Sequence, residues 1–179
     1  MRMNGFEKYR TFPEEGTGRN VDEMPMLIAS GRVPLSVSGL MARRFELADS
    51  KDAELRAKWI DNYFDTGDAV LYHPDGRIKI VYDAQVLREM TPESERVGGA
   101  LVLEDKIHDL ETCHDIFDDT DGVEFSPSGL QRMKNERPLT AKDVTSHPIW
   151  QTLARDKKLL NDYVERFFPE MKERFKYNE

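Results

Sequence analysis

The sequence predicts an α+β fold, in which helices pack on a small antiparallel sheet built around a β-hairpin at residues 69–82. Apolar side chains recur at helical spacing on both sides of this hairpin, and the hairpin itself has a strong turn pattern. The order of helices, hairpin, strand and helices also lacks the regular strand–helix alternation of a parallel sheet. We therefore expect one α+β domain at residues 23–179, preceded by a flexible N-terminal arm at residues 1–22 that is rich in turn formers and charges.

Three helices are expected before the hairpin. A short helix spans residues 24–31 and ends at Gly31. Ser36 can then cap a helix over residues 37–47, because its hydroxyl oxygen can accept a hydrogen bond from a main-chain N–H of the first turn. A further helix is predicted over residues 51–64, where apolar residues recur every four positions. The last two helices form an antiparallel pair whose broad apolar face must be covered by another element.

The hairpin joins two strand-forming runs through the turn His73-Pro74-Asp75-Gly76. Proline pre-sets the first turn angle and glycine takes the positive φ, while basic and apolar residues alternate along residues 77–82. We interpret His73 as an exposed hairpin residue rather than a functional group, since turn chemistry already accounts for its neighbours.

Short elements are predicted after the hairpin. Asp83 can cap a short helix that runs to residue 90. The continuous apolar run at residues 100–103 suits a buried strand, and residues 123–125 suit a further short strand. Ser126, followed by proline, can open a helix through about residue 135.

One long amphipathic helix is expected near the C-terminus. Ser146 or His147 caps it, proline follows in its first turn, and an apolar face continues to Phe168. Pro169 should break or kink this helix before a short tail helix at residues 170–177.

Cysteine usage and hydropathy exclude several protein classes. Cys113 is the single cysteine, so the chain has no intrachain disulfide framework. Its first eight residues lack the apolar region of a secretory signal, and its longest apolar runs are far shorter than the roughly 20 residues of a membrane span. The sequence therefore predicts a cytoplasmic protein with no membrane partner.

The basic residues give little indication of a nucleic-acid surface. The pairs Arg43-Arg44 and Lys157-Lys158 are isolated and lack the interleaved aromatic residues typical of such surfaces. The sequence thus disfavours direct nucleic-acid binding, and it is compatible with a homo-oligomer.

The net charge of −8 is concentrated in residues 104–124. This acidic segment holds nine of the 34 acidic residues and one of the 26 basic residues, which leaves 25 residues of each sign in the rest of the chain. The mild acidity of the protein is therefore a local property.

A helix in the acidic segment would be electrostatically unfavourable. If Asp109 caps it, Glu111, Asp115 and Asp119 follow at intervals of four residues, where each like-charged pair costs an isolated helix about 0.2–0.5 kcal/mol. Asp118 and Asp119 would also lie near the helix C-terminus, where the helix dipole disfavours anions. A bound cation or a basic partner would relieve this repulsion.

Three interpretations of the acidic segment follow. It is a solvated acidic face, as charge runs usually are. Alternatively, it is a divalent-cation site with Glu111, Asp115, Asp118 and His114 as ligands, since hard cations prefer clustered carboxylate oxygens. Finally, it is a docking surface for a basic protein partner, or a surface that mimics nucleic acid.

The leading functional hypothesis is a non-enzymatic interaction or regulatory module whose acidic docking surface lies at residues 104–124. The alternative is a divalent-metal-dependent enzyme, for example a hydrolase, that binds its cation through the Glu111, Asp115 and Asp118 carboxylates. His114 is then the candidate catalytic acid or base. The sequence leaves open whether the chain is an enzyme, and a divalent cation is the only cofactor that it suggests.

Overall fold

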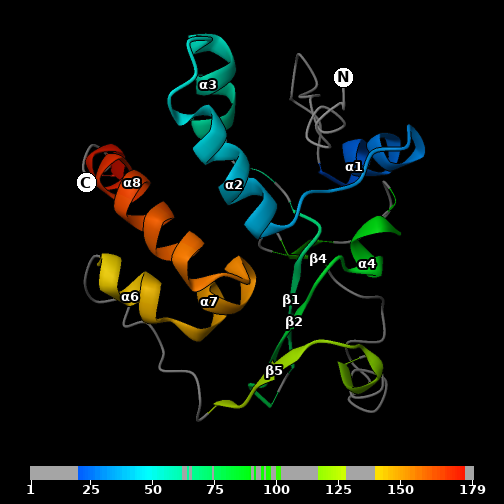
Figure 1. Ribbon diagram of the computed structural model, residues 1–179. Helices are drawn as coiled ribbons and strands as arrows, with labels where there is room; N and C mark the ends of the chain where they lie inside the picture. Colours follow the sequence, from blue (N-terminus) through cyan, green and yellow to red (C-terminus); the bar gives the residue numbers. More distant parts are fainter. Residues whose placement is uncertain are drawn as a thin grey trace. The chain divides into compact units, whose positions relative to one another are not determined.

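A computed structural model describes residues 20–61, 64, 66–73, 75–89, 91, 94, 96–97, 100–101, 117–127 and 140–175. It shows helices together with a small antiparallel sheet, so the predicted α+β class is confirmed (Figure 1). The chain divides into two compact units, and each is assembled from two separate stretches: Met1–Ser36 with Asp65–Pro127, and Val37–Phe64 with Ser128–Glu179. The division into an arm at residues 1–22 and one domain at residues 23–179 stays a prediction.

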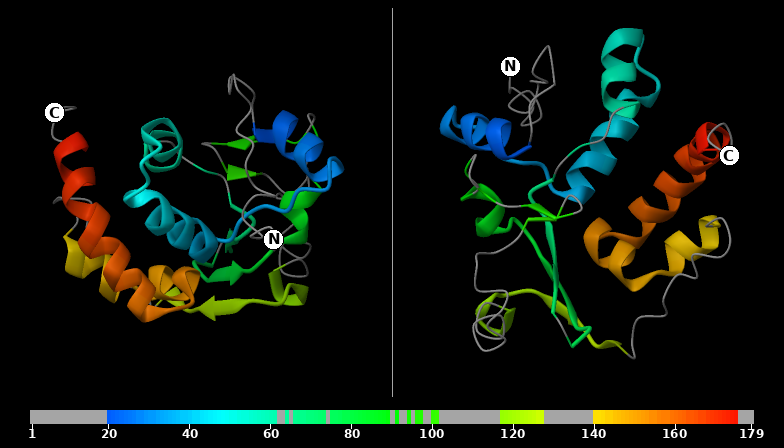
Figure 2. Two further views of the ribbon diagram at one scale, coloured as in Figure 1. Left: turned by 45° about the horizontal axis from the view of Figure 1, so that its top comes forward. Right: turned by 180° about the vertical axis from the view of Figure 1, so that it is seen from behind.

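The sheet of the first unit is built on the predicted hairpin. Strand β1 (Ala69–Tyr72) pairs antiparallel with β2 (Ile78–Val81), which pairs antiparallel on its other side with β5 (Val123–Phe125). The strand order is therefore β1-β2-β5 (Figure 2). Gly76 has a φ of 91°, as the turn pattern predicted, because a residue without Cβ takes this conformation at little cost.

Alternation along the strands gives the sheet two different faces. Leu71, Lys79 and Glu124 lie opposite one another across the three strands, and so do Tyr72, Ile78 and Phe125 in the next row. Because successive side chains point to opposite faces, the first row and the second row lie on different faces. On the face of the first row, Ala69, Val81 and Ala84 form a small buried core, packed against Leu71, Val86 and Leu87.

The remaining elements of this unit are short. Helix α1 (Asn20–Ala29) contains Pro25, and α4 (Gln85–Arg88) is in contact with α1. The predicted helix, capped by Asp83 and running to residue 90, is shorter than expected, since α4 has Ala84 as its N-cap and ends at Arg88. Asp83 has a φ of 52° and does not cap the helix. The predicted strand at 100–103 corresponds to β4 (Ala100–Leu101), which pairs with β3 (Arg96–Val97) in a separate two-stranded sheet.

The second unit is helical. Helices α2 (Val37–Ala48) and α3 (Ala53–Ile60) form the predicted pair, although α3 ends four residues before the expected end at residue 64. Helices α6 (Ala141–Ser146), α7 (Pro148–Ala154) and α8 (Lys157–Phe175) follow. Figure 1 shows α2 and α8 side by side, in agreement with their contacts.

The prediction of one long helix to Phe168 was wrong. Arg155 takes a left-handed conformation with a φ of 58°, which separates α7 from α8. Pro169 lies inside α8 and does not end it, since the helix continues to Phe175. His147 does occupy the N-cap position of α7, as expected, although its side chain makes no capping hydrogen bond.

The core of the helical unit joins α2, α7 and α8. Its buried centre consists of Met41, Ala154, Leu160 and Val164. Arg44 ties the same helices to α3, because its Nε donates to the Trp59 oxygen at 2.9 Å and its guanidinium donates to the Tyr163 hydroxyl at 2.6 Å. None of the helices in the described part of the chain is both long enough and apolar enough to cross a membrane.

Candidate functional site

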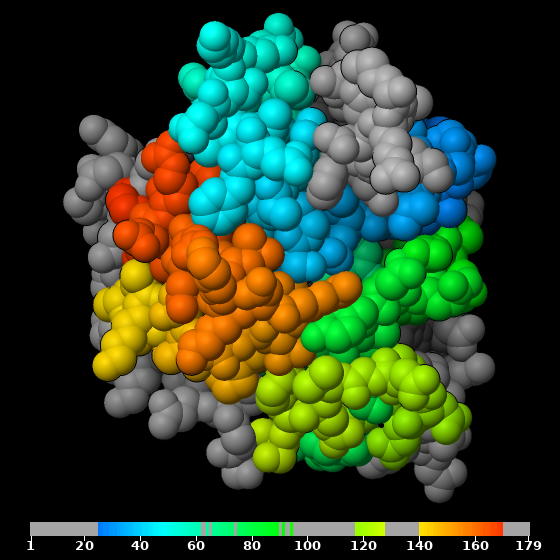
Figure 3. All heavy atoms as spheres, in the orientation of Figure 1, coloured from blue at the N-terminus to red at the C-terminus, as the bar shows by residue number. Residues whose placement is uncertain are grey.

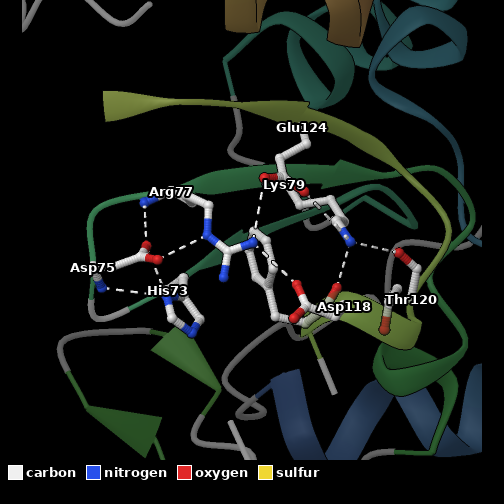
Figure 4. Close-up of polar contacts among 8 residues, drawn as sticks. His73, Asp75, Arg77, Lys79, Asp118, Thr120 and Glu124 are labelled. Carbon is white, nitrogen blue, oxygen red and sulfur yellow. Dashed lines mark hydrogen bonds and ion pairs between the residues drawn. The ribbon is translucent and has the colours of Figure 1, made fainter. Parts of the chain in front are cut away.

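The described part of the acidic segment is residues 117–124, which join a helical turn at 117–119 to strand β5. Of the predicted metal ligands, Asp118 lies here and has an exposed side chain. Glu111, His114 and Asp115 lie outside the described residues, so the proposed metal site and the catalytic role of His114 stay predictions. The residues that surround Asp118 define a charged cluster, drawn in Figure 4: His73, Asp75, Arg77, Lys79, Asp118 and Glu124.

Arg77 is the centre of the charged cluster. It lies next to β2, and its guanidinium is 2.8 Å from the Asp75 carboxylate, 3.0 Å from that of Asp118 and 3.3 Å from that of Glu124. The same guanidinium lies over the ring of Phe117, 4.8 Å from its centroid. The hydrogen bond to Asp75 and then the one to Asp118 raise the pKa of Arg77, so this cation is firmly charged.

Asp75 is held as an anion by the hairpin turn itself. The main-chain N–H of Arg77 donates to its carboxylate at 2.9 Å and is the largest cause that lowers the pKa of Asp75 well below its usual value. The side chains of Arg77 and His73 act in the same direction. This turn therefore presents a fixed negative charge beside Arg77 (Figure 4).

Lys79 stabilises the end of the helical turn in the acidic segment. Its side chain is buried in the middle of β2, and its Nζ donates to the main-chain oxygens of Phe117 and, at 2.9 Å, of Thr120. The last carbonyls of a helical turn lack intrahelical donors and carry partial negative charge, so a cation there is favourable. Lys79 thus supplies, from within the chain, a positive charge at the end of this turn, where the helix dipole disfavours Asp118 and Asp119.

His73 is buried, which corrects the prediction that it is an exposed hairpin residue. Its exposed fraction is 6%, and its ring lies 5.2 Å from that of Phe117. Its Nδ1 lies 3.2 Å from the main-chain nitrogen of Asp75 and 2.7 Å from the Asp75 carboxylate. The turn pattern could not reveal this burial, because Phe117 comes from a distant part of the chain and covers the turn only in the folded protein.

Arg77 and Lys79 were predicted only as alternating strand residues, and their role in the site was missed. Two cations two residues apart on a strand share one face, and residues 104–124 are the one strongly acidic stretch of the chain. This combination of a basic strand face and an acidic stretch is the pattern from which their contact could have been predicted.

Part of the acidic segment has no counter-charge among the residues that the structure describes. Asp118 and Glu124 share Arg77, whereas Asp119 and Asp121 are exposed and form no ion pair with the described residues. Among the described residues of this region, the five acids at positions 75, 118, 119, 121 and 124 outnumber the two cations, Arg77 and Lys79. The described part of this surface therefore keeps a net negative charge.

The part of the chain that the structure describes contains no arranged set of metal ligands. There, no group of three or more His, Cys, Asp or Glu side chains is placed to hold a metal ion. An ion at Asp118 would also have to compete with the Arg77 guanidinium, which is 3.0 Å from its carboxylate.

Comparisons with protein-family models, with curated proteins and with solved structures gave no match to this chain. Its function is therefore argued from the geometry of the charged cluster.

Proposed function

We propose that the protein is a non-enzymatic interaction module and that residues 104–124 are an acidic docking surface for a basic protein partner. The observation that carries this proposal is the pair Asp119 and Asp121, which are exposed and lack a counter-ion among the described residues. Asp119 is the last residue of the helical turn, and Asp121 lies between this turn and β5. Lys79 donates to the main-chain oxygens of Phe117 and Thr120 in the same stretch.

Two physical effects favour this role. The internal cations Arg77 and Lys79 orient residues 117–124 without neutralising their acids, so less conformational entropy of this stretch is lost when a partner binds. The remaining negative charge attracts a basic partner and raises its association rate, most strongly at low ionic strength.

The metal-dependent alternative draws its support from the sequence. Asp118 is the one candidate ligand among the described residues, and its ion pair with Arg77 favours a structural role for this carboxylate. Metal binding is therefore one outcome of the test rather than a second proposal.

The direct test is the binding of a fluorescent, capped octalysine peptide to the full chain at several salt concentrations. We expect the double variant Asp119→Asn, Asp121→Asn to bind about tenfold more weakly at low salt, which corresponds to about 1.4 kcal/mol. The matched control Glu54→Gln, Glu165→Gln removes two exposed acids from the helical unit and should bind like the wild type.

Equal binding by the two double variants would show that net charge, and not this surface, attracts the peptide.

Thermal unfolding after EDTA treatment, with Mg²⁺, Mn²⁺, Ca²⁺ or Zn²⁺ added back, tests the metal-dependent alternative. An ion that binds the native state must raise the midpoint by mass action. A rise that Asp118→Asn abolishes would favour the metal-dependent enzyme over the docking module.

A further inference from the structure

Strand β5 is an end strand of the sheet, with one edge paired to β2. Among the residues that the structure describes, no strand pairs with its other edge. The strand is also accessible at its side chains, since Val123 is 40% exposed and the Glu124 side chain is 41% exposed. In the space-filling view, residues 117–127 form a continuous yellow-green part of the surface (Figure 3).

The hairpin determines which main-chain groups of β5 point outward. The N–H of His73 donates to the Arg77 oxygen at 2.9 Å, so the main-chain groups of Arg77 point toward β1. In an antiparallel ladder these groups alternate from residue to residue, so those of Ile78 and Ile80 point toward β5. Phe125 and Val123 lie opposite these two residues. The N–H and C=O of Glu124, between them, therefore point away from the sheet.

The side chains at this edge alternate between acidic and apolar surroundings. The Glu124 carboxylate lies on the face of Arg77 and Lys79, at 3.3 Å and 3.9 Å from their nitrogens. Val123 and Phe125 lie on the other face, where Tyr72, in the same row as Phe125, is 72% exposed. A strand added to β5 would thus meet acidic groups with one set of side chains and apolar groups with the next.

Charge decides which strand fits this edge. A second copy of β5 would bring its own Glu124 and Asp121 close to the same acids, and like charges on neighbouring strands are destabilising. A strand with lysine or arginine at alternate positions would place an opposite charge beside Glu124.

We infer that a basic partner binds in extended conformation along the outer edge of β5, with basic side chains on the Glu124 face and apolar side chains on the Val123 face. This inference rests on the proposed docking function and specifies its partner as an alternating basic and apolar peptide segment. The outward N–H and C=O of Glu124 provide the main-chain hydrogen bonds, and the alternation of the edge provides the selectivity.

The test uses the full chain and two capped hexapeptides of the same composition, lysine alternating with valine. The first contains only L-residues, and the second carries D-lysine at every lysine position, which prevents regular strand pairing at unchanged charge. We expect the first peptide to bind at least about tenfold more tightly and to slow hydrogen exchange of the Glu124 amide at saturation.

Two variants of Glu124 separate the main chain from the charge. Glu124→Ala and Glu124→Pro both remove the carboxylate, and only proline also removes the outward N–H, which edge strands tolerate. Glu124→Pro should bind the first peptide several-fold more weakly than Glu124→Ala does. If the proline variant does not fold, the exchange rate of the Glu124 amide in the wild type still decides the question.

The failures of the two proposals are distinguishable. Equal binding of both peptides, with unchanged exchange at Glu124, would overturn strand addition while the acidic docking function stands. Failure of both peptides and of octalysine to bind would overturn the docking function and the inference together.

Discussion

Lys79 Nζ donates a hydrogen bond of 2.9 Å to the main-chain oxygen of Thr120, across 41 positions of sequence. A buried strand lysine therefore completes the hydrogen bonding of a helical turn in the most acidic segment of the chain. This contact makes the acidic segment part of the sheet unit, and several measurable consequences follow from it and from its neighbours.

Replacing the buried lysine should destabilise the sheet unit. In Lys79→Met, the oxygens of Phe117 and Thr120 lose a charged donor while the volume of the side chain is nearly kept. Hydrogen bonds to charged groups contribute about 1.5–3 kcal/mol, so the unfolding free energy should fall by about that amount in urea denaturation. The control Lys158→Met changes a lysine that is 81% exposed and should leave stability nearly unchanged. A Lys79→Met protein as stable as this control would contradict the capping role.

Gly122 should not tolerate a side chain, because β2 approaches it closely. A Cβ at this position would lie 2.6 Å from the Ile80 oxygen and 2.8 Å from Lys79 Cγ. Overpacking of this kind costs about 1–3 kcal/mol, so Gly122→Ala should lower the denaturation midpoint and loosen the pairing of β5. The neighbouring change Val123→Ala, at a 40% exposed residue, should have a smaller effect. A larger effect of Val123→Ala would show that the close approach at Gly122 is unimportant.

Asp75 should make stability sensitive to acid. Its pKa is lowered first by the Arg77 main-chain N–H, so its ionised form stabilises the folded state. This contribution is complete above the pKa of an unfolded-chain aspartate, about 3.9, and is lost as pH falls toward the lower folded-state value. The difference in unfolding free energy between the wild type and Asp75→Asn should therefore be constant above about pH 5 and shrink below about pH 4.

Urea denaturation at a series of pH values measures this difference. Asp119→Asn is the matched control, since this exposed acid has no ion pair with the described residues. If the difference in unfolding free energy from the wild type does not change with pH for Asp75→Asn, as we expect for Asp119→Asn, the turn does not hold Asp75 as a stabilising anion.

His147 should make the unfolding free energy depend on pH in a range above the one in which Asp75 acts. Burial lowers its pKa below the ordinary value, so the folded state resists its protonation. Stability is then unaffected above the unfolded-state pKa of about 6.5 and decreases as pH falls below it, because the unfolded chain binds the proton more readily. In His147→Asn this loss should be absent, while asparagine still suits the N-cap position of α7. If the unfolding free energies of the wild type and of His147→Asn change in parallel between about pH 7.5 and about pH 5.5, His147 is not the cause of this pH dependence.

Local patterns predicted much of the fold. The 69–82 hairpin, the start of α2 after Ser36 and strand β5 were expected from turn chemistry, capping and alternation, and the structure confirms these elements. The break between α7 and α8 was not predicted, because a left-handed conformation at Arg155 has no signal as clear as a glycine.

The candidate site was predicted only in part. The charge count identified the acidic segment, and its described residues include the Asp118 ligand candidate, whereas Arg77, Lys79 and the burial of His73 came from the structure. These features depend on Phe117 and its neighbours packing on the hairpin, a contact between residues about 40 positions apart that no local pattern encodes.

The amino-acid order alone established the α+β class and the location of the excess negative charge, because both depend on short-range spacing or on simple composition. The tertiary structure alone decided which of these charges are neutralised. It brings Arg77 and Lys79 against Asp118, Glu124 and the helical turn, and it leaves Asp119 and Asp121 exposed near a strand edge that no other strand of the described residues pairs with. The physical reason is that charge interactions act through space over a few ångströms, and only the packing of the segment on the sheet determines those distances.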